Sequence, residues 1–142
     1  LKPIIMVVDD EPQIGEILTR FLAKHNHKPI SFTSGNDALN YLKSPVGCLS
    51  ARLCVTRRQA LVTNNFLPTP GLLLTDMEMP EMTGIELARQ VKTLYPALPI
   101  IVMSGSADGQ DRDEIFKLGA DFIPKPFDLV DLLEAVSQAD MQ

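Results

Sequence analysis

The sequence has few cysteines and no long apolar run. Two cysteines in 142 residues are too few for the disulfide framework of a small secreted protein, so we expect a reducing, cytoplasmic setting. No run of apolar residues approaches the roughly 18 that a membrane-spanning helix needs. The chain also lacks internal repeats and low-complexity tracts. These absences exclude a disulfide-rich secreted domain and a membrane protein.

Positive charge is also in short supply. The chain has 13 Lys and Arg residues against 18 Asp and Glu residues, which gives a net charge of −5. Because a nucleic-acid backbone repels negative charge, we expect no direct nucleic-acid partner. With 45% hydrophobic and 22% charged residues, the composition is that of an ordinary globular protein. At roughly 100–200 residues per domain, we expect a single domain over residues 1–142.

Short apolar runs alternate with helical patterns along the chain. The run Ile4–Val8 is continuously apolar, which is typical of a strand buried on both faces. Pro12 then begins a helix whose apolar residues recur every three or four positions. Further strands are expected at residues 30–32, 72–75, 99–103 and 121–124, and further helices at about 36–43, 83–95 and 111–118 and after Asp128. Five strand–helix units in succession predict an α/β fold with a parallel sheet covered by helices on both faces.

Two of these helices have local signals at their ends. Thr83 and Glu86 have the spacing of a capping box, in which each side chain accepts a hydrogen bond from the backbone amide of the other residue. Gly119 follows the helix predicted at 111–118, and it is a candidate for a left-handed C-terminal cap.

One stretch interrupts the alternation. Residues from about 44 to 70 separate the second helix from the third strand, where such units usually need only a few linking residues. The stretch contains Arg52, Arg57 and Arg58, no acidic residue and several apolar side chains. We interpret it as an insertion that packs on the flank of the domain or on a partner, which includes a second copy of the chain.

Polar residues follow four of the predicted strands. Asp9 and Asp10 follow the first strand, Asp76 the third, Ser104 the fourth and Lys125 the fifth. The carboxyl ends of parallel strands meet at one edge of the sheet, where ligands bind. Three crowded carboxylates repel one another unless a cation lies among them, and an all-oxygen ligand set favours Mg²⁺. Lys125 and the Ser104 hydroxyl can then hold phosphoryl oxygens, with Asp76 as the nucleophile.

The segments that carry these residues resemble the receiver domain of two-component response regulators. The resemblance rests on the motifs at residues 7–12, 74–80 with Gly84, 99–105, 119–122 and 125–127. It covers nearly the whole chain except about 44–70. It implies a flavodoxin-like, doubly wound (βα)5 fold whose five-stranded parallel sheet has the order 2-1-3-4-5.

The resemblance also implies a function, a phosphorylation-activated switch of bacterial two-component signalling. Asp76 would accept a phosphoryl group from the phosphohistidine of a sensor histidine kinase or of a histidine phosphotransfer protein. Asp9, Asp10 and Asp76 would bind Mg²⁺, with Asp10 and Asp76 as direct ligands and the backbone carbonyl of Glu78 as a further one. We expect no turnover enzyme in the usual sense, although the domain assists its own phosphorylation and dephosphorylation.

The remaining roles concern the change of shape. Ser104 would move to hydrogen-bond the phosphoryl group and Lys125 would pair with that group, with the peptide bond between Lys125 and Pro126 in the cis form. Phe122 occupies the position of an aromatic switch that rotates inward when Ser104 moves, although an ordinary core aromatic is the alternative. The surface of the last two strand–helix units would shift as a result. A homodimer is one further assembly that we consider.

Two alternatives use a similar fold. A haloacid-dehalogenase-type phosphatase also places an Asp nucleophile and Mg²⁺ after a buried strand. That family expects Asp two residues after the nucleophile and Thr or Val two residues further, where this sequence has Glu78 and Pro80. A pseudo-receiver would keep the fold as a binding module without phosphorylation. The intact set of site residues argues against it.

Overall fold

A computed structural model describes residues 4–43, 70–106 and 108–140 of the chain. Within these residues, five parallel strands form one sheet in the order β2-β1-β3-β4-β5. The strands are β1 (Ile4–Val8), β2 (Lys28–Phe32), β3 (Pro70–Asp76), β4 (Ile100–Ser104) and β5 (Asp121–Pro124). The predicted fold class and strand order are therefore confirmed.

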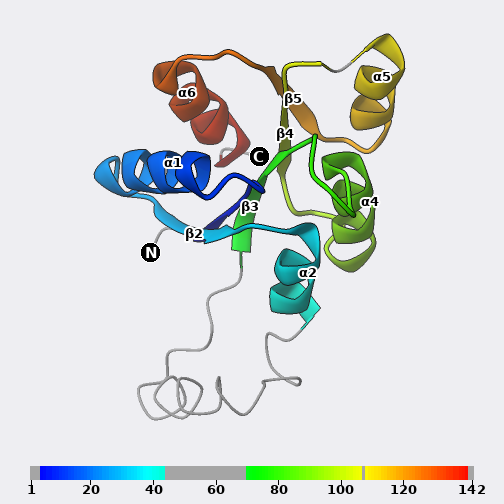
Figure 1. The fold of residues 1–142 in the computed structure, drawn as a ribbon, viewed down its shortest axis with the longest axis horizontal. Coiled ribbons are helices and arrows are strands. Elements are labelled where there is room, and N and C mark those ends of the chain that lie inside the picture. The colour runs from blue at the N-terminus through cyan, green and yellow to red at the C-terminus, as the bar shows by residue number, and fades with distance from the viewer. Residues whose placement is uncertain (1–3, 44–69, 107, 141–142) are drawn as a thin grey trace.

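Helices cover both faces of this sheet (Figure 1). The helices α1 (Pro12–Lys24) and α6 (Leu129–Asp140) lie on one face, and the helices α2 (Gly35–Lys43), α4 (Gly84–Leu94) and α5 (Gly109–Lys117) lie on the other. None of the helices described is long and apolar enough to cross a bilayer.

The sheet divides the hydrophobic core into two parts. Successive side chains of a strand point to opposite faces, so Met6 and Val8 pack in the cluster beneath α2 and α4, while Ile5 and Val7 pack in the cluster beneath α1 and α6. All four side chains are buried. The strand is continuously apolar rather than alternating because both of its faces are covered.

The ends of the elements differ from the predictions by one or two residues in most cases. The strand expected at 30–32 begins at Lys28, and the strand expected at 99–103 is shifted by one residue. The helix expected from Asp111 begins at Gly109 instead, because Asp108 and Asp111 form a capping box at its start. At Thr83 and Glu86, where a capping box was predicted, the Glu86 amide donates to the Thr83 hydroxyl at 3.2 Å. Gly119 has the predicted left-handed conformation, with φ of 75°.

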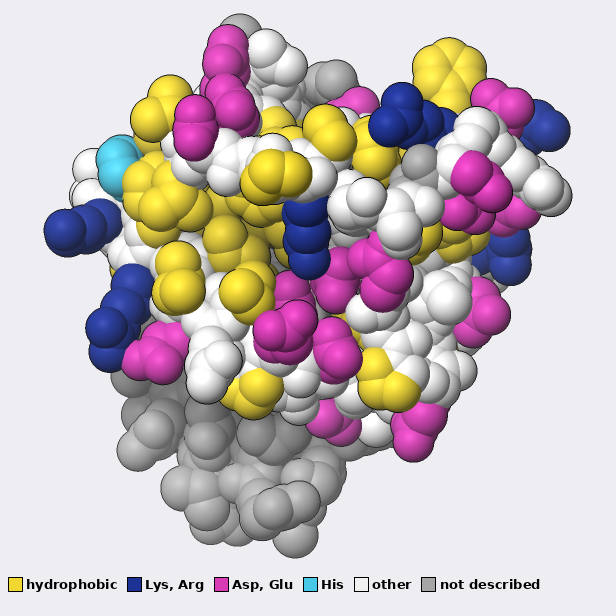
Figure 2. Space-filling view, turned by 45° about the horizontal axis from the view of Figure 1, so that its top comes forward, with side chains coloured by type: hydrophobic (Ala, Val, Ile, Leu, Met, Phe, Trp, Pro, Cys, Tyr) yellow, Lys and Arg dark blue, Asp and Glu magenta, His cyan; other side chains and the backbone are white. Residues whose placement is uncertain are grey.

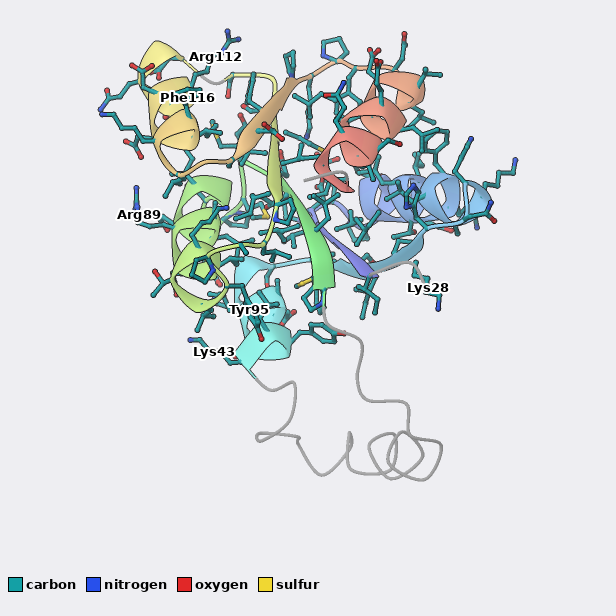
Figure 3. All side chains as sticks on the ribbon, turned by 180° about the vertical axis from the view of Figure 1, so that it is seen from behind. Lys28, Lys43, Arg89, Tyr95, Arg112 and Phe116 are labelled. Atoms are coloured by element: carbon teal, nitrogen blue, oxygen red, sulfur yellow. The ribbon has the colours of Figure 1, made fainter. Side chains whose placement is uncertain are left out.

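The last turn of α4 is tied to the end of α2. The hydroxyl of Tyr95 donates a hydrogen bond to the carbonyl oxygen of Leu42 at 3.0 Å. Figure 3 shows Tyr95 over the end of α2, close to Lys43. The predicted insertion lies outside the described residues, apart from Pro70, which is the first residue of β3 and so belongs to the sheet.

Candidate functional site

The polar residues predicted to meet do so at the carboxyl edge of the sheet. Asp9 directly follows β1, Asp76 and Ser104 are the last residues of β3 and β4, and Lys125 directly follows β5. Figure 2, in which the top of Figure 1 comes forward, shows acidic side chains gathered near the middle of this face with a basic side chain beside them. The order β1-β3-β4-β5 across the sheet brings these residues together, although they are far apart in the sequence.

Three carboxylates at this edge form a compact group of oxygen ligands. One carboxylate oxygen each of Asp9, Asp10 and Asp76 lies within 4.8 Å of the other two. Asp9 is only 1% exposed, and its Oδ2 atom has no hydrogen-bond partner. Burial, together with the nearby charge of Asp76, raises the pKa of Asp9 to about 6. A buried oxygen without a hydrogen-bond partner beside two other carboxylates fits a hard divalent cation such as Mg²⁺.

Lys125 contributes a positive charge directly beside these carboxylates. Its Nζ atom donates a hydrogen bond to Asp76 Oδ1 at 3.0 Å and lies 4.0 Å from Asp9 Oδ2. Partial burial acts to lower the pKa of Lys125, but the hydrogen bond and the charge of Asp76 outweigh it and raise the pKa. Burial also raises the pKa of Asp76, although Lys125 opposes that effect. The peptide bond between Lys125 and Pro126 is cis.

The loop that follows Asp76 is held by backbone contacts. The amide of Met77 donates to the carbonyl oxygen of Met103 at 2.8 Å, and the amide of Gly84 donates to the carbonyl oxygen of Met77 at 2.9 Å. Asp76 is 4% exposed. These hydrogen bonds tie the loop to β4 and to the start of α4, next to the buried Asp76 carboxylate.

The Glu78 side chain takes part in the site, which the sequence analysis did not predict. Only its backbone carbonyl was expected to contribute. Its Oε1 atom accepts a hydrogen bond from the Ser104 hydroxyl at 2.5 Å and another from the Ser106 hydroxyl. Glu78 is exposed, and the slight desolvation of its carboxylate acts to raise the pKa, but the hydrogen bonds that it makes, with Ser104 and Ser106 first among them, lower the pKa. The side chain therefore stays ionised.

Phe122, the predicted aromatic switch, lies in β5 next to β4. It pairs with Val102 in the sheet register and is half-buried against the core. The guanidinium of Arg112, from α5, lies 5.0 Å from the centre of the Phe122 ring, which is a cation–π distance. Figure 3 shows Arg112 and Phe116 on the same helix.

Comparison with known proteins identifies the family. The model of the response regulator receiver domain matches residues 5–137. The chain therefore belongs to the response regulator receiver domains, the signalling-switch modules of two-component systems. The phosphatase and the pseudo-receiver are not favoured by this match.

Individual relatives agree with this assignment. The chain is 32% identical over 139 residues to the DNA-binding transcriptional regulator NtrC of Salmonella typhimurium, over 97% of this chain and 25% of that protein. It is 43% identical over 70 residues to the transcriptional regulatory protein FixJ of Rhizobium meliloti, over 49% of this chain and 34% of that protein. The crystal structure of a response regulator receiver protein from Pseudomonas putida matches with a TM-score of 0.75 at 28% identity, over 97% of this chain and 98% of that one. The chain thus spans about a quarter of the length of NtrC.

Proposed function

We propose that this domain is switched by transfer of a phosphoryl group from a phosphohistidine to Asp76. The donor would be a sensor histidine kinase or a histidine phosphotransfer protein. The observation that supports this most is the position of Asp76, which lies beside two further carboxylates and 3.0 Å from the Lys125 ammonium. That arrangement offers an oxygen nucleophile together with positive charge for the phosphoryl oxygens.

The transfer itself needs one bond to form and one to break. An oxygen of the Asp76 carboxylate attacks phosphorus, and a P–O bond forms while the P–N bond of the donor breaks. The electron pair of the broken bond goes to the donor imidazole, which takes up a proton. Lys125 then pairs with the transferred group, and Ser104 donates its hydroxyl hydrogen to a phosphoryl oxygen.

The proposed metal ligands lie at the ends of β1 and β3, next to the phosphoacceptor. The carboxylates of Asp9, Asp10 and Asp76 and the backbone carbonyl of Glu78 would hold Mg²⁺. When bound, Mg²⁺ supplies the positive charge that offsets the charge of the incoming phosphoryl group. The buried Asp9 Oδ2 supports this proposal, because it accepts no hydrogen bond and the Lys125 ammonium comes no closer than 4.0 Å, so a further cation would favour its ionised form.

The phosphorylated state is expected to be temporary and to have a different surface. Water attacks phosphorus, the P–O bond to Asp76 breaks, and inorganic phosphate leaves with the carboxylate restored. While the phosphoryl group is present, Ser104 is drawn toward it, and Phe122 turns into the space that Ser104 leaves. The surface formed by α5, β5 and α6 would carry the signal, through a balance between two conformations. The domain assists both reactions without being an ordinary turnover enzyme.

We also propose how this domain is delimited and what it is joined to. Residues 1–142 would form one receiver domain with an insertion between α2 and β3. The names of NtrC and FixJ describe transcriptional regulators. A longer protein of that kind could place a DNA-binding part beside this domain, whose own charge of −5 does not favour contact with DNA. Dimerisation of the domain is a further way to transmit the signal.

Labelling with a small phosphodonor tests the proposal. The protein is incubated with acetyl phosphate and Mg²⁺, and the bound phosphoryl groups are counted by intact mass. We expect one group in the wild type, none in Asp76→Asn because an amide is a poor nucleophile, and none when EDTA removes the metal. Steady hydrolysis of a generic phosphate ester over many turnovers would instead support a phosphatase.

A further inference from the structure

The hydroxyl of Ser104 is already engaged in this structure. It donates its hydrogen to Glu78 Oε1 at 2.5 Å, and a serine hydroxyl has a single hydrogen to donate. Ser104 is 1% exposed and sits at the end of β4, so water does not compete easily for that hydrogen. Ser104 therefore cannot donate to a phosphoryl group on Asp76 until it releases Glu78.

Ser106 forms hydrogen bonds with both Glu78 and Ser104. Its hydroxyl donates to the same Oε1 atom of Glu78, and its backbone amide donates to the Ser104 hydroxyl oxygen at 3.1 Å. Glu78, Ser104 and Ser106 are thus joined in a closed ring of three hydrogen bonds, two of which end on Glu78 Oε1. Two of these bonds end on an ionised acceptor, and such bonds are stronger than bonds between neutral groups.

The charge of Glu78 opposes the arrival of a phosphoryl group. Glu78 is two residues from Asp76 in the chain, and its Oε1 atom is held by Ser104 at the end of β4, the strand that pairs with β3 beside Asp76. A phosphoryl group carries about 1.5 to 2 negative charges and would repel Glu78 more strongly than the Asp76 carboxylate does. The Glu78 side chain has room to move, since it also lines an open groove of about 530 Å³ between the β3–α4 loop, α4 and α5.

We propose that the Glu78 carboxylate is a latch, which holds the Ser104 hydroxyl in the unphosphorylated domain and releases it when a phosphoryl group on Asp76 repels the carboxylate. The inference rests on the proposed function, because it needs Asp76 to be the acceptor. In this account Glu78 is a positioning residue that acts through Ser104. The free energy needed to break the hydrogen bond between Ser104 and Glu78 reduces the net gain when Ser104 bonds the phosphoryl group.

A double-mutant cycle separates the latch from a simple effect of charge. The probe is beryllofluoride with Mg²⁺, a reversible mimic of a phosphoryl group on a carboxylate, and its dissociation constant is measured by NMR. Glu78→Met keeps the length of the side chain and the backbone carbonyl but removes the acceptor. We expect it to tighten beryllofluoride binding about tenfold more in the wild-type background than in the Ser104→Ala background. A tenfold change corresponds to about 1.4 kcal/mol, close to the lower end of what a hydrogen bond to a charged group contributes.

Two further variants serve as controls. Glu86→Met removes an acidic side chain that lines the same groove, and it should change binding equally in both backgrounds because Glu86 does not accept a bond from Ser104 in this structure. Ser106→Ala removes one of the two hydroxyl donors, and we expect it to tighten binding in the same direction as Glu78→Met but by less.

The outcomes are distinct. Equal tightening by Glu78→Met in both backgrounds would mean that Glu78 acts through its charge alone, which overturns the latch and leaves the proposed function intact. If the wild type neither binds beryllofluoride nor is labelled by acetyl phosphate, the proposed function fails and the latch fails with it.

Discussion

Gly84, the first residue of α4, lies directly against the backbone of Asp76. A Cβ atom at residue 84 would overlap the carbonyl oxygen of Asp76 and lie 2.9 Å from the Cα atom of Met77. Both obstacles are backbone atoms, which cannot turn aside as a side chain can. The start of α4 can therefore pack directly against the loop that carries the proposed phosphoacceptor only because residue 84 is a glycine.

Substituting this glycine should be costly. We expect Gly84→Ala to lower the free energy of unfolding by about 1–3 kcal/mol, the usual effect of overpacking a buried position. Denaturant unfolding measures it, with Gly35→Ala as the matched control. Gly35 is likewise the buried first residue of a helix, but its added Cβ would meet the flexible end of the Met82 side chain, at 2.8 Å from Sδ. Equal losses in the two variants would contradict the backbone contact described here.

Asp9 should destabilise the fold at neutral pH when no metal is present. Because burial raises its pKa from 3.8 to about 6, the folded state loses stability as pH rises from about 4 through 6. At 1.36 kcal/mol per pKa unit, the loss is about 3 kcal/mol at pH 7. In EDTA at pH 7, Asp9→Asn should therefore unfold at a higher temperature than the wild type.

The dependence on pH and metal provides the check. The advantage of Asp9→Asn should shrink as the pH is lowered toward 4, since the wild-type carboxyl group is then neutral. Mg²⁺ should raise the melting temperature of the wild type more than that of the variant. A variant that is less stable than the wild type in EDTA at pH 7 would show that the carboxylate is not the unfavourable group.

Ser104→Ala should separate phosphorylation from the change of shape. A hydrogen bond to a charged group contributes about 1.5–3 kcal/mol, but Ser104→Ala also loses the bond to Glu78, so the coupling between phosphorylation and the change of shape should weaken by at most roughly 10- to 100-fold. Asp76 should still be labelled by acetyl phosphate. Backbone NMR shifts around Phe122 report the change, and shifts on phosphorylation that equal those of the wild type would rule out the role of Ser104.

Replacing residues 44–69 with a short Gly/Ser linker should leave the fold and the labelling of Asp76 intact. The cost of closing a loop changes by only about 0.6 kcal/mol per doubling of its length, so the shortened chain should be slightly more stable. The apolar residues and arginines of the segment suggest a docking role, so self-association or kinase preference should change. Sedimentation and labelling of both proteins check this. Failure of the shortened chain to fold would assign the segment to the core.

Much of the site could be predicted because it depends on strand ends. Asp9, Asp76 and Lys125 each come directly at or after an apolar strand, and a parallel sheet brings such ends to one edge. The sequence also contained the signal for the start of α5, since Asp108 and Asp111 have capping-box spacing.

The contacts of Glu78 could not be predicted in the same way. Its hydrogen bond to Ser104 joins residues 26 positions apart and depends on how two loops approach each other above the sheet. The same is true of Gly84, whose close contact with Asp76 depends on the angle at which α4 enters. Local patterns indicate which residue types are present in such loops, but packing decides which atoms meet.

The most direct test of the central claim is to locate the phosphoryl group. After incubation with acetyl phosphate and Mg²⁺, the acyl phosphate is reduced with borohydride, and the modified residue is identified by peptide mass spectrometry. We predict that the peptide containing Asp76 carries the modification, and that Asp76→Asn carries none. Modification at another carboxylate in the wild type, or undiminished labelling of Asp76→Asn, would contradict the assignment of Asp76 as the phosphoacceptor.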